Sequence, residues 1–222
     1  MLKEIERRSG EVSLGTVSKV CKSLEDDLIL ERSRRKLPAE RPATRRRHGE
    51  SPRPPRAGPS PLERRLHLLQ PEKLLDLLAA NYALPAVSRT FRGKCGLRPM
   101  ELRTRLAGWE EKSKARVVLT GASSVDAYAV MAREPMQSFY CSDIDGAIRH
   151  LGDDIRETDR FADVTLLETQ DEFVYFDRRS GLWASPIQTY LELLAGDKRE
   201  RETAEQVRQV ILEPLARSSG KG

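Results

Sequence analysis

The sequence predicts an α/β (α+β) protein with an N-terminal partial winged helix-turn-helix, a basic disordered linker and a C-terminal mixed α/β domain. Two observations lead to this prediction. Over the last two thirds of the chain, short β-branched and aromatic runs alternate with amphipathic helical segments, which is the pattern of a sheet covered by helices. Near the N-terminus, basic residues gather together with prolines. We place the three parts at residues 1–36, 37–65 and 66–222.

The composition excludes several classes of protein. Of the 222 residues, 33% are charged and 38% are hydrophobic, which does not fit a collagen-like, mucin-like or wholly disordered chain. The apolar runs are a few residues long, as at 117–119, and far short of the ~20 residues of a membrane span. Residues 1–9 are rich in charge and precede no apolar segment, so no secretory signal is recognised. We expect a cytoplasmic protein without a membrane partner.

Cysteine and histidine are scarce. The sequence contains Cys21, Cys95, Cys141, His48, His67 and His150. Three distant cysteines without a Cys-x-x-Cys motif predict neither a disulfide framework nor a zinc site, and we expect no cofactor. A nucleophilic pair of Cys141 with His150 is conceivable, but we favour a structural role in which Cys141 ends a strand and His150 lies on a polar helix.

The charge is unevenly distributed along the chain. Residues 1–65 contain 17 Lys/Arg and 10 Asp/Glu, whereas residues 66–222 contain 22 and 24. Within the first part, residues 31–65 hold 12 basic and 4 acidic side chains and most of the chain's prolines. Such a segment buries too little apolar surface to offset its ordering entropy. We therefore predict a flexible basic linker, which either binds polyanions non-specifically or is a solvated tether.

The N-terminal segment has the pattern of a DNA-binding helix. A short helix is expected over residues 2–8, followed by a break at Ser9-Gly10-Glu11 and a second helix that begins after Ser13, a good N-cap. The apolar positions of the second helix recur at helical spacing: Leu14, Val17, Cys21 and Leu24. Its opposite face carries small, hydroxylated or cationic residues: Gly15, Thr16, Ser18, Lys19, Lys22 and Ser23. Such a face can approach phosphates and offer donors to base edges.

A short strand is expected from Leu28, followed by basic residues where a winged-helix protein places its wing. The wing's return strand is not recognised, because the Pro/Arg segment stands in its place, and the unit is predicted to be incomplete. The candidate DNA-binding residues are Ser13, Thr16, Ser18, Lys19, Lys22, Ser23, Arg32, Arg34 and Arg35. The alternative is a small amphipathic helical hairpin that only packs.

The last two thirds of the chain predict a mixed sheet with helices. Strands are expected at 116–120, 138–141, 164–167 and 173–176. Helices are expected at 71–78, 102–109, 125–130, 144–151, 186–195 and 197–211, with Asp143 and Ser185 as N-caps and Gly196 as a helix end. A domain of this kind buries a core of its own.

Several segments of this domain resemble a known family. They are Leu119 to Ser124, Phe161 to Leu166, and above all Ala184-Ser185-Pro186-Ile187-Gln188-Thr189-Tyr190-Leu191 with the following Gly-Asp-Lys-Arg. Together with the Val-Ser-x-Gly-x-Val-Ser run from Val12, they are similar to the AbiEi-type antitoxin and transcriptional-regulator family of type IV toxin–antitoxin systems. The resemblance implies a regulator that binds the operator of its own operon and counteracts a nucleotidyltransferase-like toxin without a stable complex.

An enzyme is the alternative. Gly121-Ala122-Ser123-Ser124 after a strand, with Asp143 and Asp145 downstream, is similar to a nucleotidyltransferase pattern in which a Gly-Ser turn holds phosphate and two carboxylates hold Mg²⁺. That chemistry needs both carboxylates on one face of a strand. Gly146-Ala147-Ile148 reads as the start of a helix, so Asp143 is better explained as an N-cap. We favour a regulator over an enzyme.

Overall fold

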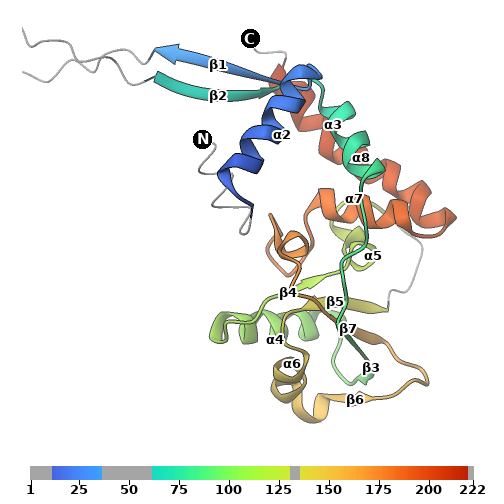
Figure 1. Ribbon diagram of the computed structural model, residues 1–222. Coiled ribbons are helices and arrows are strands. Elements are labelled where there is room, and N and C mark those ends of the chain that lie inside the picture. The colour runs from blue at the N-terminus through green and yellow to red at the C-terminus, as the bar shows by residue number, and fades with distance from the viewer. Residues whose placement is uncertain (1–11, 37–61, 131–135, 220–222) are drawn as a thin grey trace, which may run out of the picture. The chain divides into compact units, whose positions relative to one another are not determined.

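The protein has the mixed α/β fold that the sequence predicts, in a computed structural model that describes residues 12–36, 62–130 and 136–219 (Figure 1). The chain divides into two compact units, residues 1–73 and 74–222. The predicted helix at 2–8 and the predicted flexibility of the Pro/Arg segment at 37–61 lie outside the described residues.

The first unit contains helix α2 (Leu14–Asp26), which begins and ends with recognisable caps. The hydroxyl of Ser13 accepts a hydrogen bond from the Thr16 amide, as predicted. At the other end, the Ile29 amide donates to the Leu24 carbonyl and the Leu28 amide donates to the Glu25 carbonyl. This is the Schellman arrangement, and Leu28 occupies its left-handed position with a φ of 57°.

A two-stranded antiparallel sheet follows α2 in the first unit. Strand β1 (Leu30–Lys36) pairs with β2 (Leu62–Leu68), with Leu30 opposite Leu68 and Lys36 opposite Leu62. The expectation that the return strand is absent is therefore wrong, because the strand lies beyond the Pro/Arg segment. The division at residue 65 is also displaced: β2 belongs to the first unit, whose boundary lies at Lys73.

The second unit is built on a five-stranded sheet of order β4-β5-β7-β3-β6. Its strands are β3 (Arg89–Cys95), β4 (Val117–Leu119), β5 (Gln137–Cys141), β6 (Ile155–Glu157) and β7 (Val164–Glu168). Strands β5 and β7 are parallel, and the other neighbours are antiparallel. The α-helices are α3 (Pro71–Ala80), which spans the unit boundary, α4 (Pro99–Lys112), α5 (Gly121–Ser124), α6 (Ile144–Leu151), α7 (Pro186–Ala195) and α8 (Lys198–Ser219).

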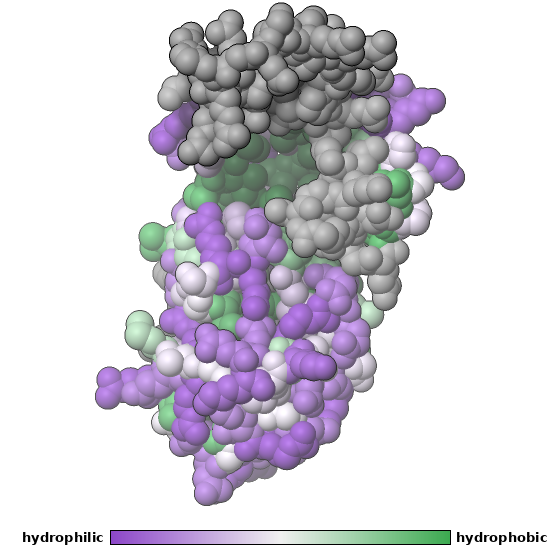
Figure 2. Space-filling model, turned by 90° about the vertical axis from the view of Figure 1, so that its left-hand side faces the viewer, coloured by the Kyte–Doolittle hydropathy of each residue, from purple (hydrophilic) through white to green (hydrophobic). Residues whose placement is uncertain are grey.

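One face of this sheet carries the main core. Leu119, Phe139, Leu166 and Phe91 lie side by side across four strands, and all four are almost completely buried. Helices α4 and α6 cover this face from the same side (Figure 1). In Figure 2, the lower part of the visible surface is mostly hydrophilic, and a broader hydrophobic area lies above it.

The predicted strands at 116–120, 138–141 and 164–167 are confirmed as β4, β5 and β7, and the caps at Asp143 and Ser185 are confirmed. Two expectations are wrong, and two strands were missed. The segment at 173–176 is a 3-10 turn (Glu172–Tyr175) rather than a strand. At 125–130, where a helix was expected, the structure has a 3-10 turn (Val125–Ala127), which follows the single-turn helix α5. Strands β3 and β6 were not predicted.

Within the described residues, no helix combines the length and the apolar character needed to cross a membrane.

Candidate functional site

Helix α2 presents two different faces, as its sequence predicts. Val17 and Cys21 are buried, at 5% exposed each, while Leu14 and Leu24 are partly buried. The candidate DNA-binding side chains on the opposite face are exposed: Thr16, Lys19, Lys22 and Ser23. Ser18 is half-buried at the edge of this surface. We call Thr16, Lys19, Lys22 and Ser23 the polar face of α2.

Ser13 has a capping role. Its hydroxyl accepts the Thr16 amide at 3.2 Å and lies 3.0 Å from the Thr16 hydroxyl. The same oxygen therefore fixes the first turn of α2 and the direction of the Thr16 side chain. Among the predicted DNA contacts, Ser13 is better described as a residue that positions Thr16.

The predicted wing arginines occupy different environments. The guanidinium Nε of Arg32 lies 2.7 Å from a carboxylate oxygen of Glu25, so Arg32 ties β1 to α2. Arg34 and Arg35 lie farther along the strand, at the positions paired with Arg64 and Glu63.

The chain after β2 holds the end of α2 in place. The side-chain amide of Gln70 donates to the Leu28 carbonyl at 3.0 Å, and the ammonium group of Lys73 donates to the Asp27 carbonyl at 3.1 Å. Both donors satisfy carbonyls that follow the last turn of the helix. These two hydrogen bonds attach the chain that follows β2 to the C-terminal end of α2. They fix the orientation of the helix, and so of its polar face, relative to the hairpin.

Sequence reasoning missed the contribution of β2, which brings Arg64, Arg65 and His67 to the hairpin. The His67 ring lies 2.8 Å from the Ser33 hydroxyl across the strands. A signal for this strand exists in the sequence, because Leu62, Leu66 and Leu68 fall on alternate positions. The prolines and arginines that precede it hid that alternation.

The second candidate site is the Gly-Ser turn after β4. The backbone amide of Gly121 donates at 2.7 Å to a carboxylate oxygen of Glu192, which projects from α7. A Cβ atom at position 121 would lie 2.6 Å from the Cβ of Glu192, so this approach requires glycine. A carboxyl group of the protein therefore occupies the place where the enzyme alternative puts a phosphate.

The hydroxyls of this turn are also engaged within the protein. The Ser123 hydroxyl donates to the Met136 carbonyl and accepts the Ser138 amide. The Ser124 hydroxyl accepts the Ala184 amide. These contacts join the turn to β5 and to the segment before α7.

Asp143 and Asp145 do not lie on a strand. The Asp143 carboxylate accepts the Gly146 amide at 2.9 Å as the N-cap of α6, and Asp145 in the first turn pairs with Arg89 at 2.7 Å. The two acids therefore differ from the arrangement that the enzyme alternative needs.

Cys141 ends β5 and is buried, which raises the pKa of its thiol to about 12. His150 stacks on Trp109.

Glu192 was not singled out from the sequence. Burial raises the pKa of its carboxyl from 4.5 to about 7, and the hydrogen bonds that it accepts offset part of this increase. The donors are the Gly121 amide, the side-chain amide of Gln188 and the Tyr140 hydroxyl. A glutamate four residues after Gln188 reads as an ordinary helix residue, so no local signal marks it.

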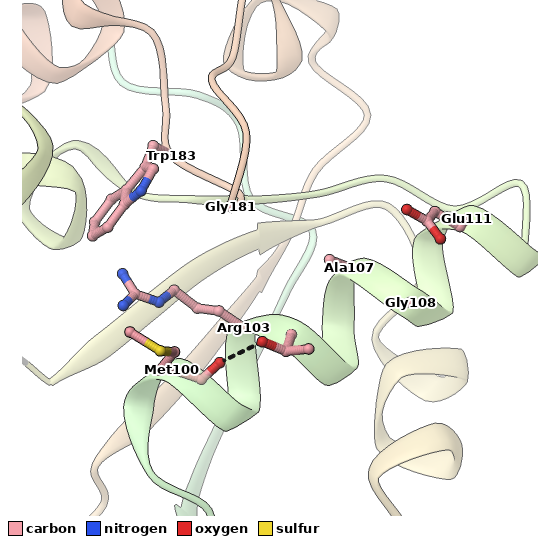
Figure 3. Close-up of a pocket in the computed structure, with 8 residues that line it drawn as sticks. Met100, Arg103, Ala107, Gly108, Glu111, Gly181 and Trp183 are labelled. Atoms are coloured by element: carbon pink, nitrogen blue, oxygen red, sulfur yellow. Dashed lines mark hydrogen bonds between the residues drawn. The ribbon is translucent and has the colours of Figure 1, made fainter.

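A shallow pocket of about 510 Å³ lies along one face of α4. Arg103 extends from this helix toward Trp183, with its guanidinium carbon 4.3 Å from the centre of the ring, and Glu111 lies at the other end (Figure 3). The hydroxyl of Thr104 donates to the Met100 carbonyl within the helix. The pocket thus combines one cation–π contact with small side chains.

In the part of the chain that the structure describes, no group of three or more His, Cys, Asp or Glu side chains is arranged to hold a metal ion. No family model matches the sequence, and comparisons with curated proteins and with solved structures find no match.

Proposed function

We propose that this chain is a DNA-binding transcriptional regulator that acts as the antitoxin of a type IV toxin–antitoxin system. The observation that carries the DNA-binding part is the completed hairpin β1–β2 beside a helix whose exposed face is polar and cationic. Helix followed by a two-stranded wing is the order of a winged helix-turn-helix. The resemblance of the Ala184–Leu191 segment to AbiEi-type antitoxins supports the second part.

In the proposed complex, α2 enters the major groove of duplex DNA with its polar face. Lys19 and Lys22 bind phosphates, and the hydroxyls of Thr16 and Ser23 lie where they can reach base edges. The basic strand positions 34 and 64 follow the phosphate backbone beside the groove. Ser13 and Arg32 act indirectly, because their contacts hold Thr16 and β1 in position.

The contacts in the second unit favour a regulator over the nucleotidyltransferase alternative. Glu192 occupies the amide of Gly121, and Asp143 and Asp145 serve as a helix cap and as an ion-pair partner. We therefore assign the second unit to counteracting a nucleotidyltransferase-like toxin without a stable complex, as the resemblance implies.

DNA binding is tested with a labelled duplex that carries the sequence upstream of the protein's own gene. Lys19→Ala with Lys22→Ala should weaken binding and flatten the slope of log affinity against log salt by about 1.8, since each lost phosphate contact contributes about 0.9. The matched control is Lys112→Ala with Lys114→Ala, two exposed lysines of the second unit. Equal affinity and slope for both double variants would remove α2 from the interface.

The antitoxin role is tested by co-expression. If a neighbouring reading frame encodes a nucleotidyltransferase-like protein that arrests growth, expression of this chain should restore growth. The Lys19/Lys22 double variant, expressed from an unrelated promoter, should still restore growth, because it affects operator binding alone. Continued arrest in the presence of the wild-type chain would contradict the antitoxin role and leave the DNA-binding result unaffected.

A further inference from the structure

The sheet of the second unit has a second face, and part of it is uncovered. At the β4–β5 end, Val118 and Tyr140 are buried under Val174, Tyr175 and Ala184. At the β3–β6 end, the residues of this face, which are every second residue along the strands, are exposed. The exposed residues are Thr90, Arg92, Lys94 and Arg156. We call Arg92, Lys94 and Arg156 the basic sheet face.

The register places these cations close together. Lys94 of β3 lies directly opposite Arg156 of β6, and Arg92 lies two residues along β3 on the same face. Like charges at directly opposed positions destabilise a strand pair. The acid on β6, Glu157, is paired with Gly93 and belongs to the other face of the pleat, so it does not compensate them.

The charges of this face are only partly neutralised. Lys94 pairs with Asp163 at 2.6 Å, while the guanidinium groups of Arg92 and Arg156 form no ion pair with any described residue. Two arginines that lack an ion pair among the described residues, beside a lysine, give this face electrostatic complementarity for an external polyanion.

An exposed aromatic residue lies in the loop that borders the same strand. The loop from Thr158 to Asp163 is attached to β3 at both ends, because the Thr158 amide donates to the Arg92 carbonyl and the Asp163 amide donates to the Gly93 carbonyl. Within it, Phe161 is 89% exposed and has a φ of 57°. A bulky residue in the left-handed region is a backbone outlier that costs free energy, and so much exposure means that packing does not repay that cost.

We propose that the basic sheet face and Phe161 form a binding site for single-stranded nucleic acid. The cations bind phosphates, and an unpaired base stacks on the Phe161 ring, as in sequence-tolerant single-strand binding. Alternate residues of β3 lie ~6.6 Å apart, about twice the rise per nucleotide of a stacked duplex strand, which suits an extended, unstacked strand. A duplex keeps its base faces covered and would leave the aromatic ring unused. This site is independent of the duplex site proposed on α2.

The test uses the full-length protein and fluorescently labelled oligomers of deoxythymidine and of uridine, with anisotropy recorded over a range of salt concentrations. Arg92→Gln with Arg156→Gln should flatten the salt dependence by about 1.4, since each phosphate contact to a single strand contributes about 0.7. The matched control, Arg149→Gln with Arg199→Gln, removes the same charge from exposed positions on α6 and α8 and should leave the slope unchanged.

Phe161 is tested by a conservative pair of substitutions. Phe161→Leu should weaken binding at least about fivefold, because it removes a stacking surface worth roughly 1 kcal/mol or more, whereas Phe161→Tyr should retain binding. A preference for uridine over deoxythymidine oligomers would identify RNA as the source of the strand, and the reverse preference would identify DNA.

Binding of both oligomers by the Arg92/Arg156 variant with the control's affinity and slope would overturn the proposal. Equal binding by Phe161→Leu and Phe161→Tyr would overturn it as well. Duplex binding should be unchanged in all of these variants, so failure of this site is distinguishable from failure of the α2 interface. All four substituted side chains on the sheet and helices are exposed, and thermal unfolding curves confirm that each variant is folded.

Discussion

The carboxyl group of Glu192 should make the stability of the second unit depend on pH near neutrality. Burial raises its pKa from 4.5 to about 7 in the folded protein. Between these two values the unfolded chain loses the proton and the folded chain keeps it, so the free energy of unfolding falls as pH rises. A pKa difference of this size corresponds to about 3 kcal/mol, because each pKa unit is worth about 1.4 kcal/mol.

The hydrogen bonds around Glu192 fit a protonated carboxyl. The side-chain oxygen of Gln188 is buried and has no partner among the described residues, while its nitrogen donates to Glu192 and to the Tyr82 hydroxyl. The oxygen and nitrogen of an amide can exchange places by a flip. After such a flip, the Gln188 oxygen accepts the proton of a neutral Glu192.

The perturbation is therefore Glu192→Gln, which replaces the carboxyl by a neutral group of the same shape. Urea unfolding is followed by the fluorescence of Trp109 and Trp183, which both lie in the second unit. Between about pH 4.5 and pH 7, the free energy of unfolding of wild type should fall by about 3 kcal/mol relative to that of the variant. Above pH 7, the variant should be the more stable protein.

The control is Glu111→Gln, which removes an exposed carboxylate at the end of the α4 pocket. It should keep the pH dependence of wild type. If the free energy of unfolding fell equally in wild type and Glu192→Gln over this range, the titrating group would lie elsewhere, which would contradict the role assigned to Glu192.

Three further substitutions test the caps and the core. Leu28→Gly should stabilise the first unit by about 0.5–1 kcal/mol in urea unfolding followed by circular dichroism, since Leu28 is 65% exposed and left-handed; a loss of stability would show that its side chain packs. Asp143→Asn should change the free energy of unfolding by less than about 1 kcal/mol, because asparagine also caps helices, and a larger loss would indicate another role for the carboxylate. Phe139→Ala should cost about 3–5 kcal/mol, since Phe139 is fully buried in the main core, and a loss below 1 kcal/mol would contradict that assignment.

The parts of the fold that the sequence predicts are those with strong local signals. Ser13, Asp143 and Ser185 are N-caps in the structure as in the sequence, because a capping side chain acts within three residues. The buried strands β4 and β5 carry β-branched and aromatic residues, whose preference for strands needs no distant information.

The missed strands have a different character. β3 contains Arg92, Gly93 and Lys94, and its inward positions include a glycine, so alternation of apolar and polar residues is interrupted. β6 is three residues long and contributes Ile155 alone to the core. Both strands exist because their neighbours in the sheet supply the hydrogen bonds, which is a tertiary effect that local propensity does not contain.

The exposed polar face of α2 was predictable from the sequence, but the strand pair that follows the helix was not. The polar face follows from helical periodicity alone. Strand β2 pairs Leu68, His67 and Leu66 with Leu30, Glu31 and Arg32, respectively, across the long Pro/Arg segment, and closing a loop of that length adds little to the entropic cost. A separation at residue 65 divides this pairing, so a fragment of residues 1–65 should lack the β2 end that lies beside α2. The first unit therefore extends to Lys73, whose ammonium group donates a hydrogen bond to the Asp27 carbonyl at the end of α2.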